Sequence, residues 1–117
     1  MLQKALSKYA KKFDDSCFGW TKDKEYNLMF LKHQENYFNE LLRKRGYLFL
    51  GDVFEGLGMR ITKESCLVGW IFEKNNKIGD NFVEFDIYEA DNSNFFVDFN
   101  VDGNIIDRLF LKNKAQR

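Results

Sequence analysis

Apolar and polar residues alternate with a helical period at the start of the chain. Within 2–13 the apolar residues recur at intervals of three and four, at Leu2, Ala5, Leu6, Tyr9, Ala10 and Phe13. This spacing predicts an amphipathic helix followed by a polar loop that ends near residue 24. A lysine-rich helix of this kind can lie on a membrane or in a partner's groove. We expect it instead to pack its apolar face on the core.

A longer apolar stripe predicts a second helix over 24–46. The residues that form it fall within one arc of the helical wheel: Tyr26, Phe30, Leu31, Tyr37, Phe38, Leu41 and Leu42. The polar residues are expected on the opposite side: Lys32, Glu35, Asn36, Asn39 and Arg43. The basic run 43–45 suits the negative end of the helix dipole, and Gly46 is a suitable left-handed stop.

Beyond residue 46 the pattern changes to that of strands. The run 47–50 predicts a short buried strand, and 52–57 predicts a short helix. Segments rich in β-branched and aromatic residues predict further strands over 66–72, 81–88, 95–101 and 104–111. Asp102-Gly103 is a two-residue hairpin signal. We therefore expect an α+β fold, with amphipathic helices packed on an antiparallel sheet of four to five strands.

Length and charge constrain this picture further. The 117 residues suit a single domain over 1–117. Eighteen basic and eighteen acidic residues give no net charge, which argues against direct nucleic-acid binding. No signal peptide and no apolar run long enough to span a bilayer can be read. Because Cys17 and Cys66 form no disulfide pattern, we expect a reduced, cytoplasmic setting without membrane contact.

Motifs for metal, cofactor and catalytic sites are incomplete. Residues 98–103 reproduce the D-x-N-x-D-G opening of a calcium loop, but Leu109 stands where its bidentate Glu belongs. His33 is the single histidine, which leaves no zinc cluster and no catalytic set around it. Gly56-Leu57-Gly58 lacks a third glycine, because Ile61 occupies that position. We expect no cofactor, no metal site and no catalytic residue.

The distribution of charge is the unusual feature. Residues 1–46 carry a net charge of +4 and residues 47–117 a net charge of −4. No lysine or arginine occurs in 79–107, which holds eight acidic residues: Asp80, Glu84, Asp86, Glu89, Asp91, Asp98, Asp102 and Asp107. They can form the solvated face of a half-buried sheet, a binding surface, or a carboxylate site. Lys77, Arg108 or Lys112 could instead fold over them and neutralise them. We predict that they form an acidic β face for a basic partner.

Several separated blocks carry a resemblance to a known family. They are RGYLFLGDVFEGLG at 45–58, TKE at 62–64, VGW at 68–70, GDNFV at 79–83 and DFNVDG at 98–103. Over about 37–111 the chain resembles a family of small proteins of unknown function encoded by phages, prophages and conjugative elements of Gram-positive bacteria. The resemblance implies a mobile-element protein in a bacterial cytoplasm, and it assigns no role to any residue.

These observations together predict a non-enzymatic protein-binding accessory or inhibitor factor. Its expected partner is a host or phage protein, in the most specific case one with a basic nucleic-acid-binding groove. Anti-CRISPR and anti-restriction proteins are an analogy of context. Two alternatives stay open: a structural or assembly component of a phage particle, and a metal-dependent hydrolase that uses Glu84, Asp86, Asp98 and Asp107. The oligomeric state is left open.

Overall fold

The computed structural model describes residues 5–115 of the chain. The fold class is α+β, as predicted. In chain order the elements are β1 (Lys11–Phe13), α1 (Lys24–Arg45), β2 (Tyr47–Phe49), α2 (Leu50–Gly56), a 3₁₀ turn (Glu64–Cys66), β3 (Val68–Ile71), β4 (Phe85–Glu89), β5 (Phe95–Phe99), β6 (Gly103–Asn104) and α3 (Ile106–Ala115).

The strands form two small antiparallel sheets instead of one sheet of four to five strands. One sheet has the order β1-β5-β4, and the other has the order β2-β3-β6. The chain leaves the first sheet after β5, and the Asp102 amide then donates to the Gly69 carbonyl of β3 over 2.8 Å. Asp102-Gly103 therefore does not form the predicted hairpin, because the strands on its two sides belong to different sheets.

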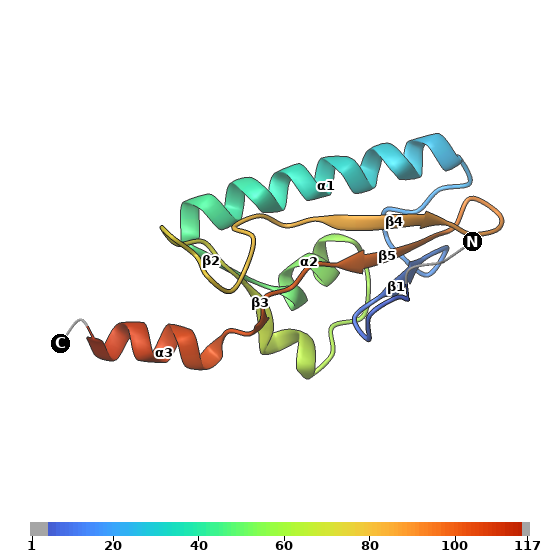
Figure 1. Ribbon diagram of the computed structural model, residues 1–117. Helices are drawn as coiled ribbons and strands as arrows, with labels where there is room; N and C mark the ends of the chain where they lie inside the picture. The colour runs from blue at the N-terminus through green and yellow to red at the C-terminus, as the bar shows by residue number, and fades with distance from the viewer. Residues whose placement is uncertain (1–4, 116–117) are drawn as a thin grey trace.

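Helix α1 has the bounds that its sequence predicts. At its start the Asp23 carboxylate accepts hydrogen bonds from the amides of Glu25 and Tyr26, and it ends at Gly46 with φ +84°. Only glycine adopts that left-handed conformation without strain from a Cβ atom. Figure 1 shows α1 running alongside β4.

Two polar side chains of α1 lie on the opposite side of the helix from the one predicted. The Asn39 side chain accepts a hydrogen bond from the Val83 amide and donates one to the Val83 carbonyl, over 2.7 and 2.8 Å. The Glu35 carboxylate accepts from the Phe85 amide over 2.7 Å. Because β4 is an edge strand, these side chains provide partners for backbone groups that no neighbouring strand satisfies.

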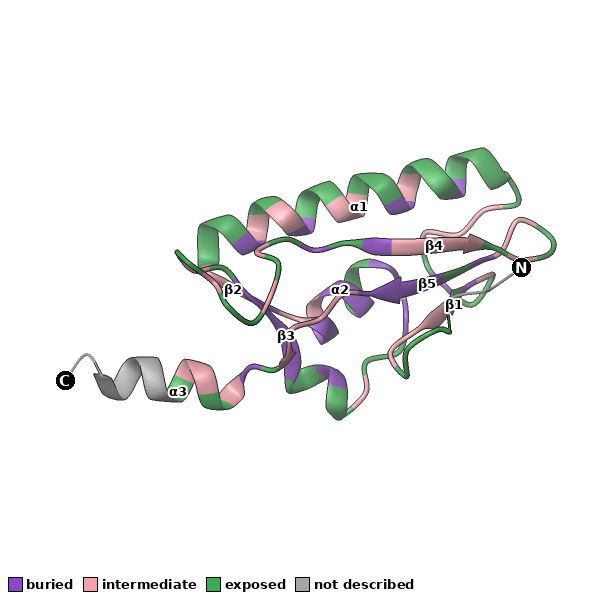
Figure 2. Ribbon diagram, viewed as in Figure 1, coloured by how far each residue is buried: buried purple, intermediate pink, exposed green. Residues whose placement is uncertain are grey.

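The core lies between α1, α2 and the two sheets, where Figure 2 shows the buried residues. Phe13 of β1 stacks on Phe30 of α1 with ring centroids 5.6 Å apart. Phe54 of α2 meets Phe99 of β5 edge to face at the same separation. The largest side chain that is fully buried among the described residues is Trp70 of β3.

The predicted amino-terminal helix is wrong over its described residues. Leu2 lies outside the described residues, 5–10 are not helical, and 11–13 form β1. Strand β1 pairs with β5, with Lys11 opposite Val97 and Phe13 opposite Phe95. This pairing buries Phe13 completely and gives its neighbours ladder hydrogen bonds, which a helix packed on the surface would not provide.

The predicted strand at 104–111 is also wrong. After the two residues of β6 the Asn104 side chain accepts a hydrogen bond from the Ile106 amide over 2.9 Å, and α3 begins. Figure 1 shows α3 extending away from the rest of the molecule. The radius of gyration is accordingly 15.1 Å, against roughly 13 Å for a compact chain of this length. No helix within residues 5–115 is long and apolar enough to cross a membrane.

Candidate functional site

The structure disperses the eight carboxylates of 79–107 instead of gathering them on one open face. Glu89 forms an ion pair with Lys24 of α1 at 2.8 Å, and Asp91 lies 3.9 Å from the Lys12 ammonium. Asp107 is exposed in the first turn of α3 and so does not lie in a strand, as the prediction had placed it. The predicted acidic β face therefore does not form as a single continuous surface.

Asp98 is buried and holds the amino-terminal segment on the sheet. Its carboxylate accepts hydrogen bonds from the Ser7 amide over 2.7 Å and from the Ser7 hydroxyl over 2.6 Å. Asp86 lies opposite Asp98 in the β4–β5 register. Because the Asp98 carboxylate is enclosed by these contacts, it has a structural role and contributes nothing to a surface for a partner.

The side chain of Asp102 is also buried, with 1% of its surface exposed. It accepts a hydrogen bond from the Ile71 amide over 3.0 Å, and Arg108 of α3 lies 3.5 Å away. Burial raises the pKa of Asp102, an effect opposed by the Ile71 amide and by Arg108. Gly79 packs directly against this carboxylate, where any side chain would collide with it.

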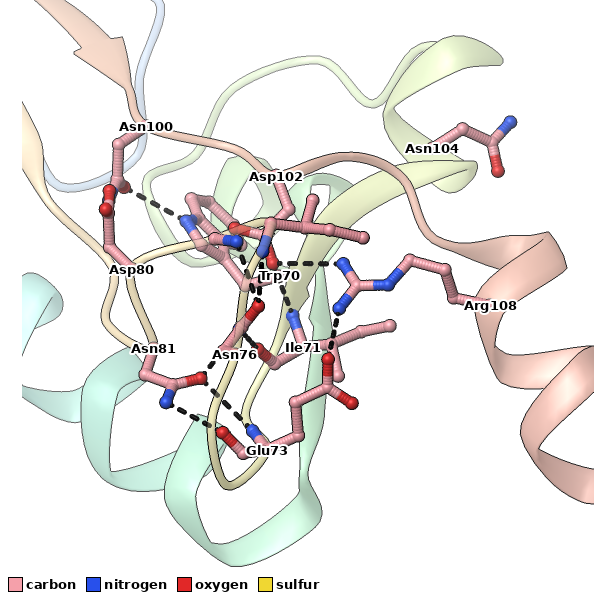
Figure 3. A network of polar contacts seen from close by, with 12 residues as sticks. Trp70, Ile71, Glu73, Asn76, Asp80, Asn81, Asn100, Asp102, Asn104 and Arg108 are labelled. Atoms are coloured by element: carbon pink, nitrogen blue, oxygen red, sulfur yellow. Dashed lines mark hydrogen bonds and ion pairs between the residues drawn. The ribbon is translucent and has the colours of Figure 1, made fainter.

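These contacts fix the base of a long loop between β3 and β4, which we call the 72–84 loop (Figure 3). Inside it, the side-chain nitrogen of Asn76 donates to the Ile71 carbonyl over 2.9 Å and to the side-chain oxygen of Asn81 over 2.8 Å. Asn81 in turn exchanges two hydrogen bonds with the backbone of Glu73, over 3.1 and 2.9 Å. Asn81 has φ +64°, a left-handed conformation that asparagine tolerates better than most residues.

Asn100 connects the far end of the loop to the core. Its side-chain oxygen accepts from the Trp70 indole over 3.0 Å and from the Glu84 amide over 2.7 Å. Its side-chain nitrogen donates to the Phe82 carbonyl over 2.9 Å and to the Asp80 carboxylate over 3.3 Å. The Asp80 side chain and the Glu84 backbone therefore both contact Asn100, and both of these predicted acidic residues are exposed.

The same loop exposes apolar side chains. Ile78 is 63% exposed and Phe82 is 44% exposed, although the backbone beside each is fixed by asparagine side chains. Binding residues are often carried on loops that a rigid scaffold positions, and the exposed apolar side chains of this loop are available for contact with a partner. The 72–84 loop, with Ile78, Asp80, Phe82 and Glu84, is the candidate functional site.

The sequence prediction included Asp80 and Glu84 but missed the rest of this site. Asn76 and Asn81 were interpreted only as loop and strand residues, and Ile78 and Phe82 were not singled out. The signal in the sequence is the pair of apolar residues, Ile78 and Phe82, within a polar, asparagine-rich segment.

The carboxylates of the hydrolase alternative lie on different elements of the structure. Within residues 5–115 no three His, Cys, Asp or Glu side chains approach closely enough to hold a metal ion. Of the four carboxylates in the hydrolase alternative, Asp98 holds Ser7 and Asp107 lies on α3. His33 is exposed on α1, and burial raises the pKa of the Cys17 thiol.

Comparisons with known proteins give a family but no characterised relative. No curated protein and no solved structure matches the chain. Residues 1–109 match one family, described as a family of unknown function. The match includes the amino-terminal residues that hold Asp98 as well as the whole 72–84 loop. The chain therefore belongs to the family of unknown function DUF6353.

Proposed function

We propose that the chain is a non-enzymatic protein-binding factor that presents the 72–84 loop to a partner protein. The observation that carries this proposal is the exposure of Ile78 and Phe82 on a loop whose backbone is fixed by Asn76, Asn81 and Asn100. Fully burying an Ile or Phe side chain stabilises a complex by about 1.5–3 kcal/mol. Such a gain would provide a reason for keeping both side chains in solvent.

Because the loop already has a fixed conformation, the free energy gained by burying Ile78 and Phe82 would not be spent on ordering the loop. Ordering a flexible side chain at an interface costs about 0.5–1.5 kcal/mol, and ordering a mobile loop costs more. In this chain the asparagine hydrogen bonds have already ordered the backbone during folding. The Asn76 side chain alone accepts from the amides of Ile78 and Gly79, over 3.0 and 2.9 Å.

The acidic residues of the 72–84 loop favour a partner with a basic surface. The second half of the loop carries Asp80 and Glu84, and its lysines, Lys74 and Lys77, precede Ile78. A basic surface would complement this half and would speed association. The most specific form of the proposal is a partner with a basic nucleic-acid-binding groove, in the bacterial cytoplasm and in the service of a mobile genetic element.

A capture experiment with matched variants tests the proposal. Purified protein is immobilised, bacterial lysate is passed over it, and bound proteins are identified by mass spectrometry. Ile78→Ser and Glu84→Lys should lose the partner. Phe110→Ser and Glu40→Lys should keep it, since Phe110 is 65% exposed, much like Ile78, and Glu40 is exposed on α1.

Two other outcomes would contradict the proposal. Equal capture by all four variants would show that the loop is not the binding surface. Sedimentation of the pure protein as a large assembly would favour the alternative of a structural component, in which the exposed apolar residues contact other copies of the chain.

A further inference from the structure

A second surface, remote in sequence from the 72–84 loop, has the features of a side-chain binding site. A cavity of about 290 Å³ lies between the second half of α1 and the short helix α2. Its apolar wall comes from α1, with Tyr37, Phe38 and Leu41. Its polar wall is formed by Arg45, Asp52 and Glu55.

The close approach of the two helices creates this cavity. Gly56 of α2 lies against the ring of Phe38, where a Cβ atom would overlap the ring. Phe38 is buried, but Tyr37 beside it is 57% exposed, with its ring edge to face against Phe38 at 5.1 Å. The cavity therefore has an aromatic wall that is only partly covered by the protein itself.

The charges around the cavity do not balance. Asp52 forms an ion pair with Arg45 at 3.5 Å, and it also accepts from the Phe49 amide over 3.3 Å. Arg45 lies over the Tyr47 ring, 4.6 Å from its centroid, which keeps the guanidinium beside Asp52. The Glu55 backbone carbonyl accepts a hydrogen bond from the Gly58 amide, but among the described side chains the Glu55 carboxylate takes part in no hydrogen bond or ion pair. Two carboxylates and one guanidinium leave one net negative charge beside an exposed aromatic ring.

We propose that this cavity binds one arginine or lysine side chain of a partner protein. The aliphatic stem would pack on Leu41 and the tyrosine ring, and the cationic group would pair with Glu55. Small-molecule pockets usually measure about 300–1,000 Å³. With a volume just below that range, the cavity suits one long side chain better than a nucleotide or a large cofactor.

The test uses a peptide probe on the full chain. The probe is acetyl-Gly-Gly-Arg-Gly-Gly-amide, and its control carries citrulline, which has the shape of arginine without the charge. Titration into ¹⁵N-labelled protein should shift the amide signals of Tyr37, Leu41 and Gly56. The citrulline peptide should bind up to about fivefold more weakly, which is the largest effect expected from losing one partly exposed ion pair.

Matched variants separate the site from general electrostatic attraction. Glu55→Gln should weaken the arginine probe about fivefold. Glu40→Gln removes the same charge from an exposed position on α1 outside the cavity lining and should change nothing. Tyr37→Leu keeps an apolar wall without the ring and should weaken binding about twofold or more.

Equal binding of the two peptides, equal binding by wild type and Glu55→Gln, or shifts that map elsewhere would each overturn the proposal. Because the cavity and the 72–84 loop share no residue, the two proposals fail independently. The loop variants Ile78→Ser and Glu84→Lys should bind the arginine probe as the wild type does.

Discussion

The core under α1 and the base of the 72–84 loop are stabilised by different chemistry. The core relies on aromatic contacts such as Phe13 with Phe30 and Phe54 with Phe99. The loop base relies on asparagine side chains and on a buried carboxylate, Asp102. Apolar burial is proportional to area and tolerates small shifts, whereas hydrogen bonds define particular atoms and directions. The first region therefore provides stability, and the second gives the loop one shape while its apolar side chains point outward.

Removing the ring of Phe54 should have the largest effect on the molecule. Phe54 is almost fully buried and packs on Phe99. Phe54→Ala should lower the free energy of unfolding by about 3–5 kcal/mol, because the lost contacts leave a cavity that the core fills only in part. Chemical denaturation measures this change. A loss below 1 kcal/mol would show that the aromatic core is not the main source of stability.

Replacing Asn100 should have a smaller effect that is concentrated in the loop. Asn100→Ala removes the partners of the Trp70 indole, of the Glu84 amide and of the Phe82 carbonyl. We expect a loss of about 1–3 kcal/mol, since the indole of the buried Trp70 would be left without its acceptor. Hydrogen exchange should accelerate in 72–84 more than in α1. Asn36→Ala, at an exposed position on α1, is the control and should leave both regions unchanged.

The local patterns predicted α1 well and predicted the chain ends poorly, for a physical reason. The limits of α1 depend on nearby residues, because Asp23 caps its first turn and Gly46 ends it. Strand β1 depends on a partner more than eighty residues away, with Phe13 opposite Phe95. Its spacing also fits a helix, so periodicity alone could not decide between the two.

Local patterns also failed to predict the carboxyl-terminal segment and most of the candidate site. The apolar residues of 104–111 suit either a strand or a helix, and the local feature that favours a helix start is the Asn104 side chain, which accepts from the Ile106 amide. For the site, the charge pattern predicted Asp80 and Glu84, which are exposed in the structure. It could not reveal that Asp98 and Asp102 are buried, because Ser7 and Arg108 reach them only in the folded chain. Asn100 likewise acts through Trp70, thirty residues earlier.

A methyl group at Gly79 should test how closely the loop fits its base. Gly79→Ala places a Cβ atom against the Asp102 carboxylate, so the loop or the carboxylate must move. We expect a loss of about 1–2 kcal/mol in the free energy of unfolding, in the range of other overpacked sites. Capture of a partner through Ile78 should also weaken. Lys77→Ala, at an exposed neighbouring position, should affect neither stability nor capture, and equal behaviour of the two variants would contradict the close fit.

The smallest predicted effect concerns the pH dependence that Asp102 contributes. Burial raises its pKa in the folded chain, so the folded state holds the proton more tightly than the unfolded state does. The stability due to this group is therefore fully present below the unfolded pKa, and it is lost as the pH rises through the folded pKa. Asp102→Asn keeps an oxygen that can accept from the Ile71 amide but does not titrate.

Other groups shift stability with pH in the opposite direction, so the difference between the two proteins is the informative quantity. A hydrogen bond from Ser16 lowers the pKa of Asp14, and Lys8 lowers that of Glu64. Both contributions are the same in the wild type and in Asp102→Asn, and they cancel in the difference. Denaturation curves between about pH 4 and pH 7 should therefore show the wild type losing stability relative to the variant as the pH rises. The opposite slope would mean that Arg108 and the Ile71 amide stabilise the Asp102 carboxylate by more than its burial costs, in which case the base of the loop would be held by an ion pair.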